Sequence, residues 1–171
     1  MLSQVRAPST FFWISSKMDT ATAVYATSQD MEIGSHNYIH HPLSGYSLVV
    51  DLAAVRRADS TITSMTGRRP FWFRSPRNLI DARGRAALAL TGHGLVHWGV
   101  NPRDYLKGRR SADIAAFVLG NVRPGSFVEL HDASDVTMRA LPSILAGLHN
   151  RGYRFVTLSE LATVSPRYVR W

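Results

Sequence analysis

The sequence of 171 residues contains no cysteine, which excludes disulfide bonds and thiolate ligands for a metal. It has only two lysines, Lys17 and Lys107, so nearly all of the positive charge behind its formal net charge of +8 comes from arginine. No apolar run is long enough to cross a bilayer, and residues 1–6 contain no apolar core of a signal peptide. We therefore expect no membrane span, and a cytoplasmic location if Met1 is the native start.

The strongly basic composition suits nucleic acid, an anionic cell wall or acidic lipid as a partner. The arginines are scattered along the chain, however, and they form no clustered motif of a nucleic-acid-binding protein. The length and the hydrophobic fraction of 45% are those of a globular protein with its own core. We predict that residues 1–171 form a single domain that does not bind nucleic acid.

Short β-branched or aromatic runs alternate with helical segments along the whole chain. The predicted strands are 9–14, 31–35, 71–73, 94–98, 127–130 and 154–156. The predicted helices are 20–29, 44–65, 81–90, 111–120, 135–150 and 159–162. This alternation predicts an α/β fold, in which a parallel sheet or barrel has its helices on the outside.

Polar side chains follow four of the predicted strands, where functional residues of such folds usually lie. The loop after residue 35 carries His36 and His40, and neutral imidazoles are the commonest protein ligands of zinc. A spacing of four places both rings on one side if the backbone turns helically. The residues alone leave two interpretations open, a metal site or two surface histidines in a polar loop.

Five segments resemble known motifs in their order and spacing. They are 32–40, 74–76, 98–105, 123–126 and 130–132. Together they resemble the polysaccharide deacetylases, the NodB-homology domains of carbohydrate esterase family four, over nearly the whole chain. The resemblance implies a distorted (β/α) barrel of the polysaccharide deacetylase type.

This resemblance also implies a hydrolase that removes N-acetyl groups from an amino-sugar-containing glycan or glycoside. It implies a divalent metal, zinc in the first place, with cobalt, nickel and manganese as alternatives. By motif, His36 and His40 would be metal ligands and His131 the general acid. Asp104 would hold and polarise His131.

Further roles follow from the same motifs. Arg74 would pair with the general base, and the backbone N–H of Arg77 would help to hold the oxyanion. Trp98 and Tyr105 would form an apolar wall for the acetyl methyl group. Each assignment has an ordinary alternative, because Arg74 also fits a surface arginine, Trp98 a core ring and Asp104 a solvated loop acid.

The family pattern has a first strand whose Asp-Asp pair provides the general base and the third metal ligand. No Asp-Asp pair occurs in the 171 residues, and we expect this chain to lack that strand. An oligomer or partner protein would then cover the unpaired sheet edge. Glu129 stands where a leucine is usual and would share a strand face with His131. It would replace the missing carboxylate, recognise a different acyl group or a basic substrate, or simply face solvent.

Two alternatives stand beside a deacetylase. One is a catalytically impaired relative that binds glycan or completes its site with a partner, and the other is a basic nucleic-acid-binding module.

Overall fold

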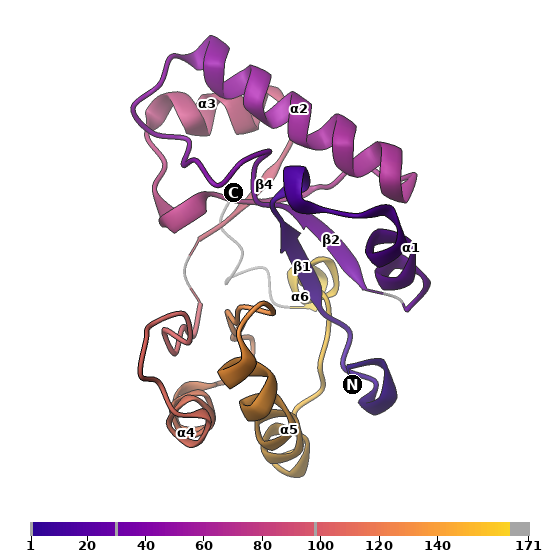
Figure 1. Cartoon of the computed structure of the whole chain (residues 1–171), viewed down its shortest axis with the longest axis vertical. Coiled ribbons are helices and arrows are strands. Elements are labelled where there is room, and N and C mark those ends of the chain that lie inside the picture. Colours follow the sequence, from indigo (N-terminus) through magenta and orange to yellow (C-terminus); the bar gives the residue numbers. More distant parts are fainter. Residues whose placement is uncertain (1, 30, 98, 165–171) are drawn as a thin grey trace. The chain divides into compact units, whose positions relative to one another are not determined.

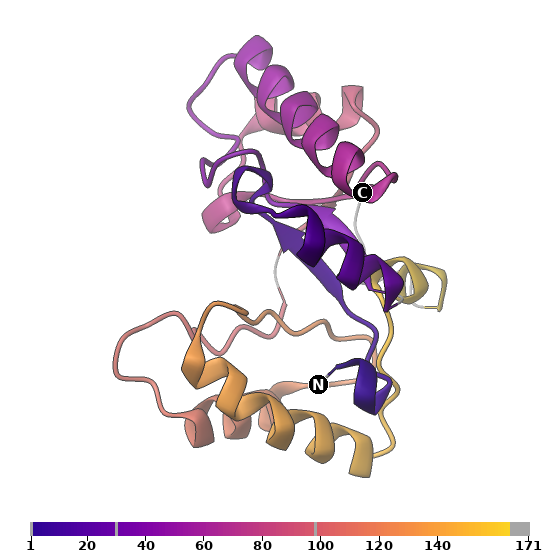
Figure 2. The ribbon, with the colours of Figure 1, turned by 45° about the vertical axis from the view of Figure 1, so that its right-hand side comes forward.

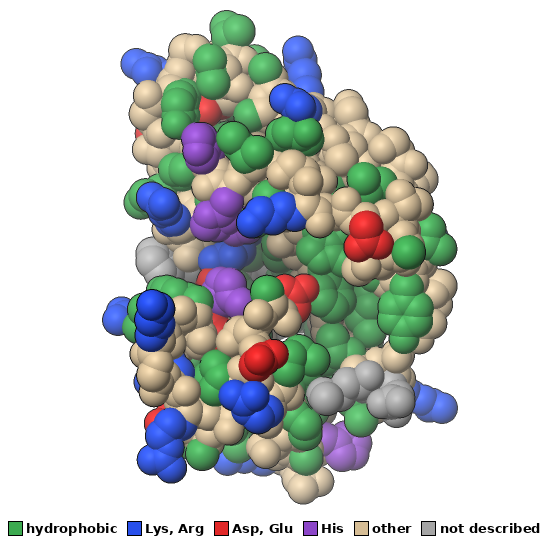
Figure 3. All heavy atoms as spheres, viewed as in Figure 1, with side chains coloured by type: hydrophobic (Ala, Val, Ile, Leu, Met, Phe, Trp, Pro, Cys, Tyr) green, Lys and Arg blue, Asp and Glu red, His purple; other side chains and the backbone are tan. Residues whose placement is uncertain are grey.

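The computed structural model describes residues 2–29, 31–97 and 99–164, which form two compact units (Figure 1). We call residues 8–97 the sheet unit. The described residues 2–7 and 99–164 form the other, which we call the helical unit. None of the helices in these described ranges is both long and apolar enough to span a membrane. On the face shown in Figure 3, Lys and Arg side chains are scattered rather than gathered in one patch.

Four parallel strands, in sequence order across the sheet, form the centre of the sheet unit. They are β1 (Thr10–Trp13), β2 (Glu32–Ser35), β3 (Trp72–Arg74) and β4 (Gly94–Val96). The helices between them are α1 (Thr20–Ser28), α2 (Leu48–Thr66) and α3 (Ala82–Leu90), with short turns η2 (Ser15–Lys17) and η3 (Pro76–Asn78). Parallel strands require such crossover connections, so the predicted alternation is confirmed in this unit.

Capping side chains set the helix ends in the sheet unit. The carboxylate of Asp81 accepts hydrogen bonds from the N–H groups of Arg83 (2.9 Å) and Gly84 (3.0 Å), which starts α3 where the sequence predicted. Helix α2 begins four residues later than predicted, because Ser47 is its N-cap. It ends at Thr66, and its C-cap is Gly67, whose φ of 70° is in the left-handed region.

The core of the sheet unit lies between the sheet and the helices α2 and α3, which lie side by side on one face (Figures 1 and 2). Its fully buried members are Leu43, Val55, Phe73 and Leu88. Gly34 makes room for a ring next to it, because a Cβ there would lie 2.6 Å from the ring of Phe12.

The helical unit is built on the packing of two helices (Figures 1 and 2). Its elements are η1 (Ser3–Val5), α4 (Ser111–Asn121), α5 (Asp135–Asn150) and α6 (Leu158–Val164). The buried residues Ile114 and Val118 of α4 pack with Ala140, Ile144 and Leu148 of α5.

Two predicted strands of this unit are wrong. The segment 127–130 forms one isolated bridge, in which Val128 faces Val100, and 154–156 forms no strand. Three apolar residues of these segments, Val128, Leu130 and Phe155, pack against the core of α4 and α5 instead. The hydrophobic pattern of these two segments therefore indicates burial and not the hydrogen-bonded pairing of strands.

Candidate functional site

His36 directly follows β2 and is held by both neighbouring strands. Its N–H donates to the carbonyl of Trp13 at 2.9 Å, and its Nδ1 lies 2.6 Å from the carbonyl oxygen of Arg74. A carbonyl only accepts, so Nδ1 carries a proton, and the neutral form of this ring has its lone pair on Nε2. A backbone carbonyl that fixes the tautomer in this way is typical of metal-binding histidines.

His40 lies beside His36, with the ring centroids 5.0 Å apart and the planes at 61°. The loop between them does not turn helically. Instead Asn37 has a φ of 70°, donates from its side-chain amide to the carbonyl of His41 at 2.8 Å, and accepts from the N–H of Tyr38 at 2.8 Å. Asn37 is thus a structural residue of this loop that we did not predict.

Two imidazoles alone can provide at most two of the ligands of a divalent ion. Among the described residues, no group of three His, Asp or Glu side chains is arranged to hold a metal. Structural and catalytic zinc sites usually use three or four protein ligands. A metal at His36 and His40 therefore needs further ligands beyond this pair.

Arg74 ends β3, and Arg77 lies in the tight turn η3 that follows. Arg77 is exposed with a φ of 57°, and the buried Asn78 has a φ of 55°. Two successive left-handed residues without glycine are uncommon and turn the chain sharply after the strand. The side chain of Ser75 fixes this turn to the histidine loop, because its hydroxyl accepts from the N–H of Leu43 at 3.2 Å.

His97, which follows β4, was missed by the sequence prediction. Burial lowers the pKa of His97, and the positive charges of Arg85 and Arg74 lower it further. This lowered pKa favours the neutral form of the imidazole. The predicted strand 94–98 included His97, and the structure ends this strand at Val96, so His97 was not recognised as a residue at a strand end. Trp98, the next residue, lies outside the described residues.

The second group of predicted residues lies in the helical unit around the buried carboxylate of Asp104. One oxygen lies 2.8 Å from Nδ1 of His131, and the other accepts from the N–H of His131 at 2.7 Å. That second oxygen also accepts from the hydroxyl of Thr137 at 2.5 Å. Burial raises the pKa of Asp104, but hydrogen bonds from His131 and Thr137 outweigh it and hold that pKa below its usual value.

This geometry keeps His131 oriented and its Nδ1 protonated. The His131 side chain remains partly exposed at 39%, whereas that of Asp104 is fully buried. The ring of Tyr105 meets that of His131 edge-on, with centroids 5.1 Å apart and planes at 72°. Thr137, in the first turn of α5, is a further residue of this group that sequence reasoning missed.

Glu129 is half-buried, and its N–H donates to the carbonyl of Val100 at 3.0 Å. The strand on which Glu129 was expected to share a face with His131 is reduced to one bridge. Strand alternation therefore does not place Glu129 and His131 on one face.

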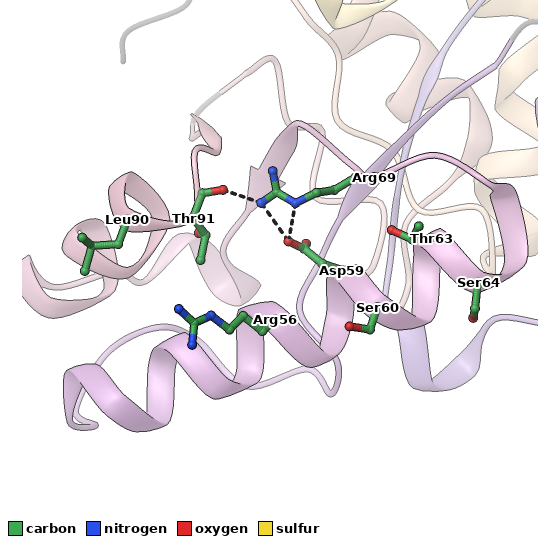
Figure 4. Close-up of a pocket in the computed structure, with 8 residues that line it drawn as sticks. All are labelled: Arg56, Asp59, Ser60, Thr63, Ser64, Arg69, Leu90 and Thr91. Carbon is green, nitrogen blue, oxygen red and sulfur yellow. Dashed lines mark hydrogen bonds and ion pairs between the residues drawn. The ribbon is translucent and has the colours of Figure 1, made fainter.

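A separate pocket of about 680 Å³ lies between α2 and the end of α3 (Figure 4). Asp59 on its wall accepts hydrogen bonds from Nε of Arg69 and from Nε2 of His93, each at 3.0 Å, and Arg69 also donates to the carbonyl of Thr91. These groups cross-link α2 to the chain around β3 and β4. The residues predicted for the functional site do not line this pocket.

Comparison with known proteins relates these features to a family. The family model described as polysaccharide deacetylase matches residues 1–96, more than half of the chain. The chain is 29% identical over 179 residues to a chitooligosaccharide deacetylase of Bradyrhizobium, a match that covers 94% of this chain and 81% of the relative. It is 26% identical over 165 residues to the peptidoglycan-N-acetylmuramic acid deacetylase PdaC of Bacillus subtilis. That match covers 95% of this chain but 34% of PdaC, so the chain spans about a third of this curated relative.

Solved structures agree with these matches. The structure of PdaC from Bacillus subtilis has a TM-score of 0.89 at 25% identity and covers 97% of this chain and 81% of that chain. A family four acetyl xylan esterase from Clostridium thermocellum, in complex with a cobalt ion, has a TM-score of 0.86 at 25% identity, covering 95% and 80%. These likenesses confirm the predicted α/β fold of the distorted (β/α)-barrel type.

Proposed function

Because the chain belongs to the polysaccharide deacetylase family, we propose that it removes N-acetyl groups from an amino-sugar-containing glycan or glycoside. Its relatives include enzymes named for chitooligosaccharides and for peptidoglycan, and both are glycans that carry N-acetylated sugars. The observation that carries the proposal is the pair of adjacent imidazoles at His36 and His40, one of them fixed by the carbonyl of Arg74.

His36 and His40 would hold a divalent metal, zinc first, with cobalt, nickel and manganese as alternatives. When bound, such an ion polarises the acyl carbonyl and lowers the pKa of the attacking water. The neutral tautomer of His36 supports this role, since Nε2 then carries the lone pair that a ligand needs. The cobalt ion of the Clostridium relative supports a divalent metal in this family.

His131 would act as the general acid. The negative charge of Asp104 favours the protonated imidazole, and its oxygen at Nδ1 leaves the second proton on Nε2. As the amide C–N bond breaks, this Nε2 proton passes to the departing amine nitrogen. Tyr105, edge-on to the His131 ring, would shield the acetyl methyl from water, with Trp98 as the second part of that wall.

The loop after β3 would stabilise the oxyanion. The sharp left-handed turn at Arg77 supports this role, because such turns direct backbone N–H groups toward an anion. The exposed side chain of Arg77 is not needed for it. Arg74 would pair with the general base, and Glu129 would either replace a missing carboxylate or select the acyl group.

A second candidate function rests on the absence of an Asp-Asp pair from the 171 residues. This second candidate is a catalytically impaired relative of the deacetylases. It would bind glycan through the same surface with little turnover, or would complete its site with a partner. Acetate release from N-acetylglucosamine oligomers, with added zinc and with chelator, separates the two. We expect release that requires the metal and is lost in His36→Ala. Glycan binding without acetate in any condition would favour the impaired relative, and neither binding nor release would refute both.

A further inference from the structure

Two exposed rings follow the histidine pair in the sheet unit. The rings of His41 and Tyr46 are nearly parallel, with an angle of 7° between their planes and 6.3 Å between their centroids. Both side chains are exposed, Tyr46 at 41%. A single exposed tyrosine needs no explanation, but stacking against His41 holds the Tyr46 ring, and with it an aromatic face, in one orientation at the surface.

The loop that carries these rings is anchored to the turn after β3. The buried Leu43 accepts from the N–H of Asp81 at 3.0 Å, and the carboxylate of Asp81 accepts from the N–H of Gly45 at 3.0 Å. Helix α3 packs so closely here that a Cβ at Gly84 would collide with the carbonyl oxygen of Leu43. The aromatic face is therefore preorganised, which reduces the entropy lost when a ligand binds.

Tyr46 does not make the helix-start contact that is usual for an apolar residue just before an N-cap. It directly precedes Ser47, the N-cap of α2, where such a residue often packs against the fourth helical residue as a hydrophobic staple. In α2 that fourth residue is Asp51, which is acidic and fully buried. The Tyr46 ring is instead exposed beside His41, while its carbonyl accepts from Arg83 at 3.2 Å.

We propose that His41 and Tyr46 form a stacking platform for a sugar ring of the substrate glycan. The inference rests on the proposed function and names where the same glycan is held. The C–H groups on one face of a pyranose suit the electron-rich face of an aromatic ring. The phenol hydroxyl and the imidazole nitrogens provide donors and acceptors for the sugar hydroxyls at the edge of the platform.

The position of the platform fits a neighbouring sugar rather than the one being deacetylated. His41 follows the proposed metal ligand His40 directly in the sequence. Ser75, in the proposed oxyanion loop, accepts a hydrogen bond from Leu43, which lies between His41 and Tyr46. In this proposal, a glycan whose acetylated sugar lies at His36 and His40 has an adjacent sugar at His41 and Tyr46. A monosaccharide would not reach the platform.

The test is a titration of the zinc-loaded protein with the N-acetylglucosamine tetramer and with the monomer, followed by calorimetry or NMR. We expect Tyr46→Ala to weaken tetramer binding about 5- to 10-fold, the range expected for one aromatic contact. Monomer binding should stay unchanged, and Tyr46→Phe should retain most of the tetramer affinity. The matched control is Tyr25→Ala, which removes a tyrosine of α1 that is 63% exposed.

Several outcomes would overturn the platform. They are a wild-type protein that does not bind the tetramer, equal affinity of wild type and Tyr46→Ala, and an equal loss in Tyr25→Ala. His41→Ala offers a second variant if Tyr46→Ala unfolds. Acetate release is measured on the same samples, so a protein that binds the tetramer through Tyr46 but releases no acetate would refute the proposed deacetylation and leave the platform standing.

Discussion

The sheet unit and the helical unit each orient a histidine through a hydrogen bond at Nδ1, but the acceptors differ. In the sheet unit, His36 meets the backbone carbonyl of Arg74, which carries no charge. In the helical unit, His131 meets the carboxylate of Asp104, which is buried and held ionised by three hydrogen bonds. Both contacts fix the tautomer, yet only the second favours the imidazolium form.

The comparison indicates that the group accepting the Nδ1 hydrogen bond decides which protonation state of a histidine is favoured. A neutral imidazole is a metal ligand, because protonation would occupy the lone pair that binds the ion. An imidazolium next to a carboxylate is a proton donor. The roles proposed for His36 and His131 can therefore be tested one unit at a time.

Removing the imidazoles of His36, His40 and His131 one at a time should have the largest effects and should separate their roles. We expect His131→Ala to lower turnover by about 10²- to 10⁴-fold, the usual contribution of a general acid, while bound zinc stays unchanged. His36→Ala and His40→Ala should lose both zinc and turnover. The measurements are acetate release and metal content after gel filtration.

The control for these variants is His149→Ala, which removes an exposed histidine in the last turn of α5. It should retain zinc and turnover. Equal loss of metal in His131→Ala and His36→Ala would show that the roles are not divided between the units as we infer.

Replacing the carboxylate of Asp104 should make His131 resemble His36, whose Nδ1 meets an uncharged acceptor. Asp104→Asn keeps the shape of the side chain but removes its charge, so the pKa of His131 should fall and turnover should decrease. Loss of charged hydrogen bonds in a buried site should lower the free energy of unfolding by about 1–3 kcal/mol. NMR titration of His131 and urea unfolding measure the two effects. Asp132→Asn, which removes a neighbouring exposed carboxylate, should change neither the pKa of His131 nor the free energy of unfolding.

The sheet unit could be predicted from the sequence because its signals are local. Strand runs such as 10–13, the capping carboxylate of Asp81 and the strand–helix alternation are readable in short windows. The helical unit was harder, because apolar residues at 127–130 and 154–156 look like strands whether they pair or only pack. Which of the two occurs depends on neighbours far away in the sequence.

The candidate site was predictable as residue types but not as contacts. His36, His40, Asp104 and His131 were predicted because they match family motifs after predicted strands, one of which, 127–130, forms only an isolated bridge. Thr137 was missed because its bond to Asp104 joins residues 33 positions apart and a threonine at a helix start is ordinary. The carbonyl that holds His36 could not be found either, since a backbone oxygen leaves no signal in a sequence.

Acid should reveal the ionised state of Asp104. Its pKa in the folded protein lies below the ordinary value of 3.8, so its ionised contacts contribute stability that is fully present above that value. This contribution is lost as the pH falls through the lower, folded pKa. The difference in unfolding free energy between the wild type and Asp104→Asn should therefore shrink below about pH 3.8 in urea titrations at successive pH values. A difference that grows with acid would contradict the assignment.

The smallest effect should come from Thr137, which has no counterpart beside His36. Thr137→Val keeps the shape but removes the donor to Asp104, so we expect the free energy of unfolding to fall by about 1 kcal/mol and turnover to fall less than tenfold. Thr137→Ser keeps the hydroxyl and should retain the turnover and the low pKa of Asp104. If serine and valine behaved alike in urea unfolding and in acetate release, the side chain would matter for packing in α5 and not for holding the carboxylate.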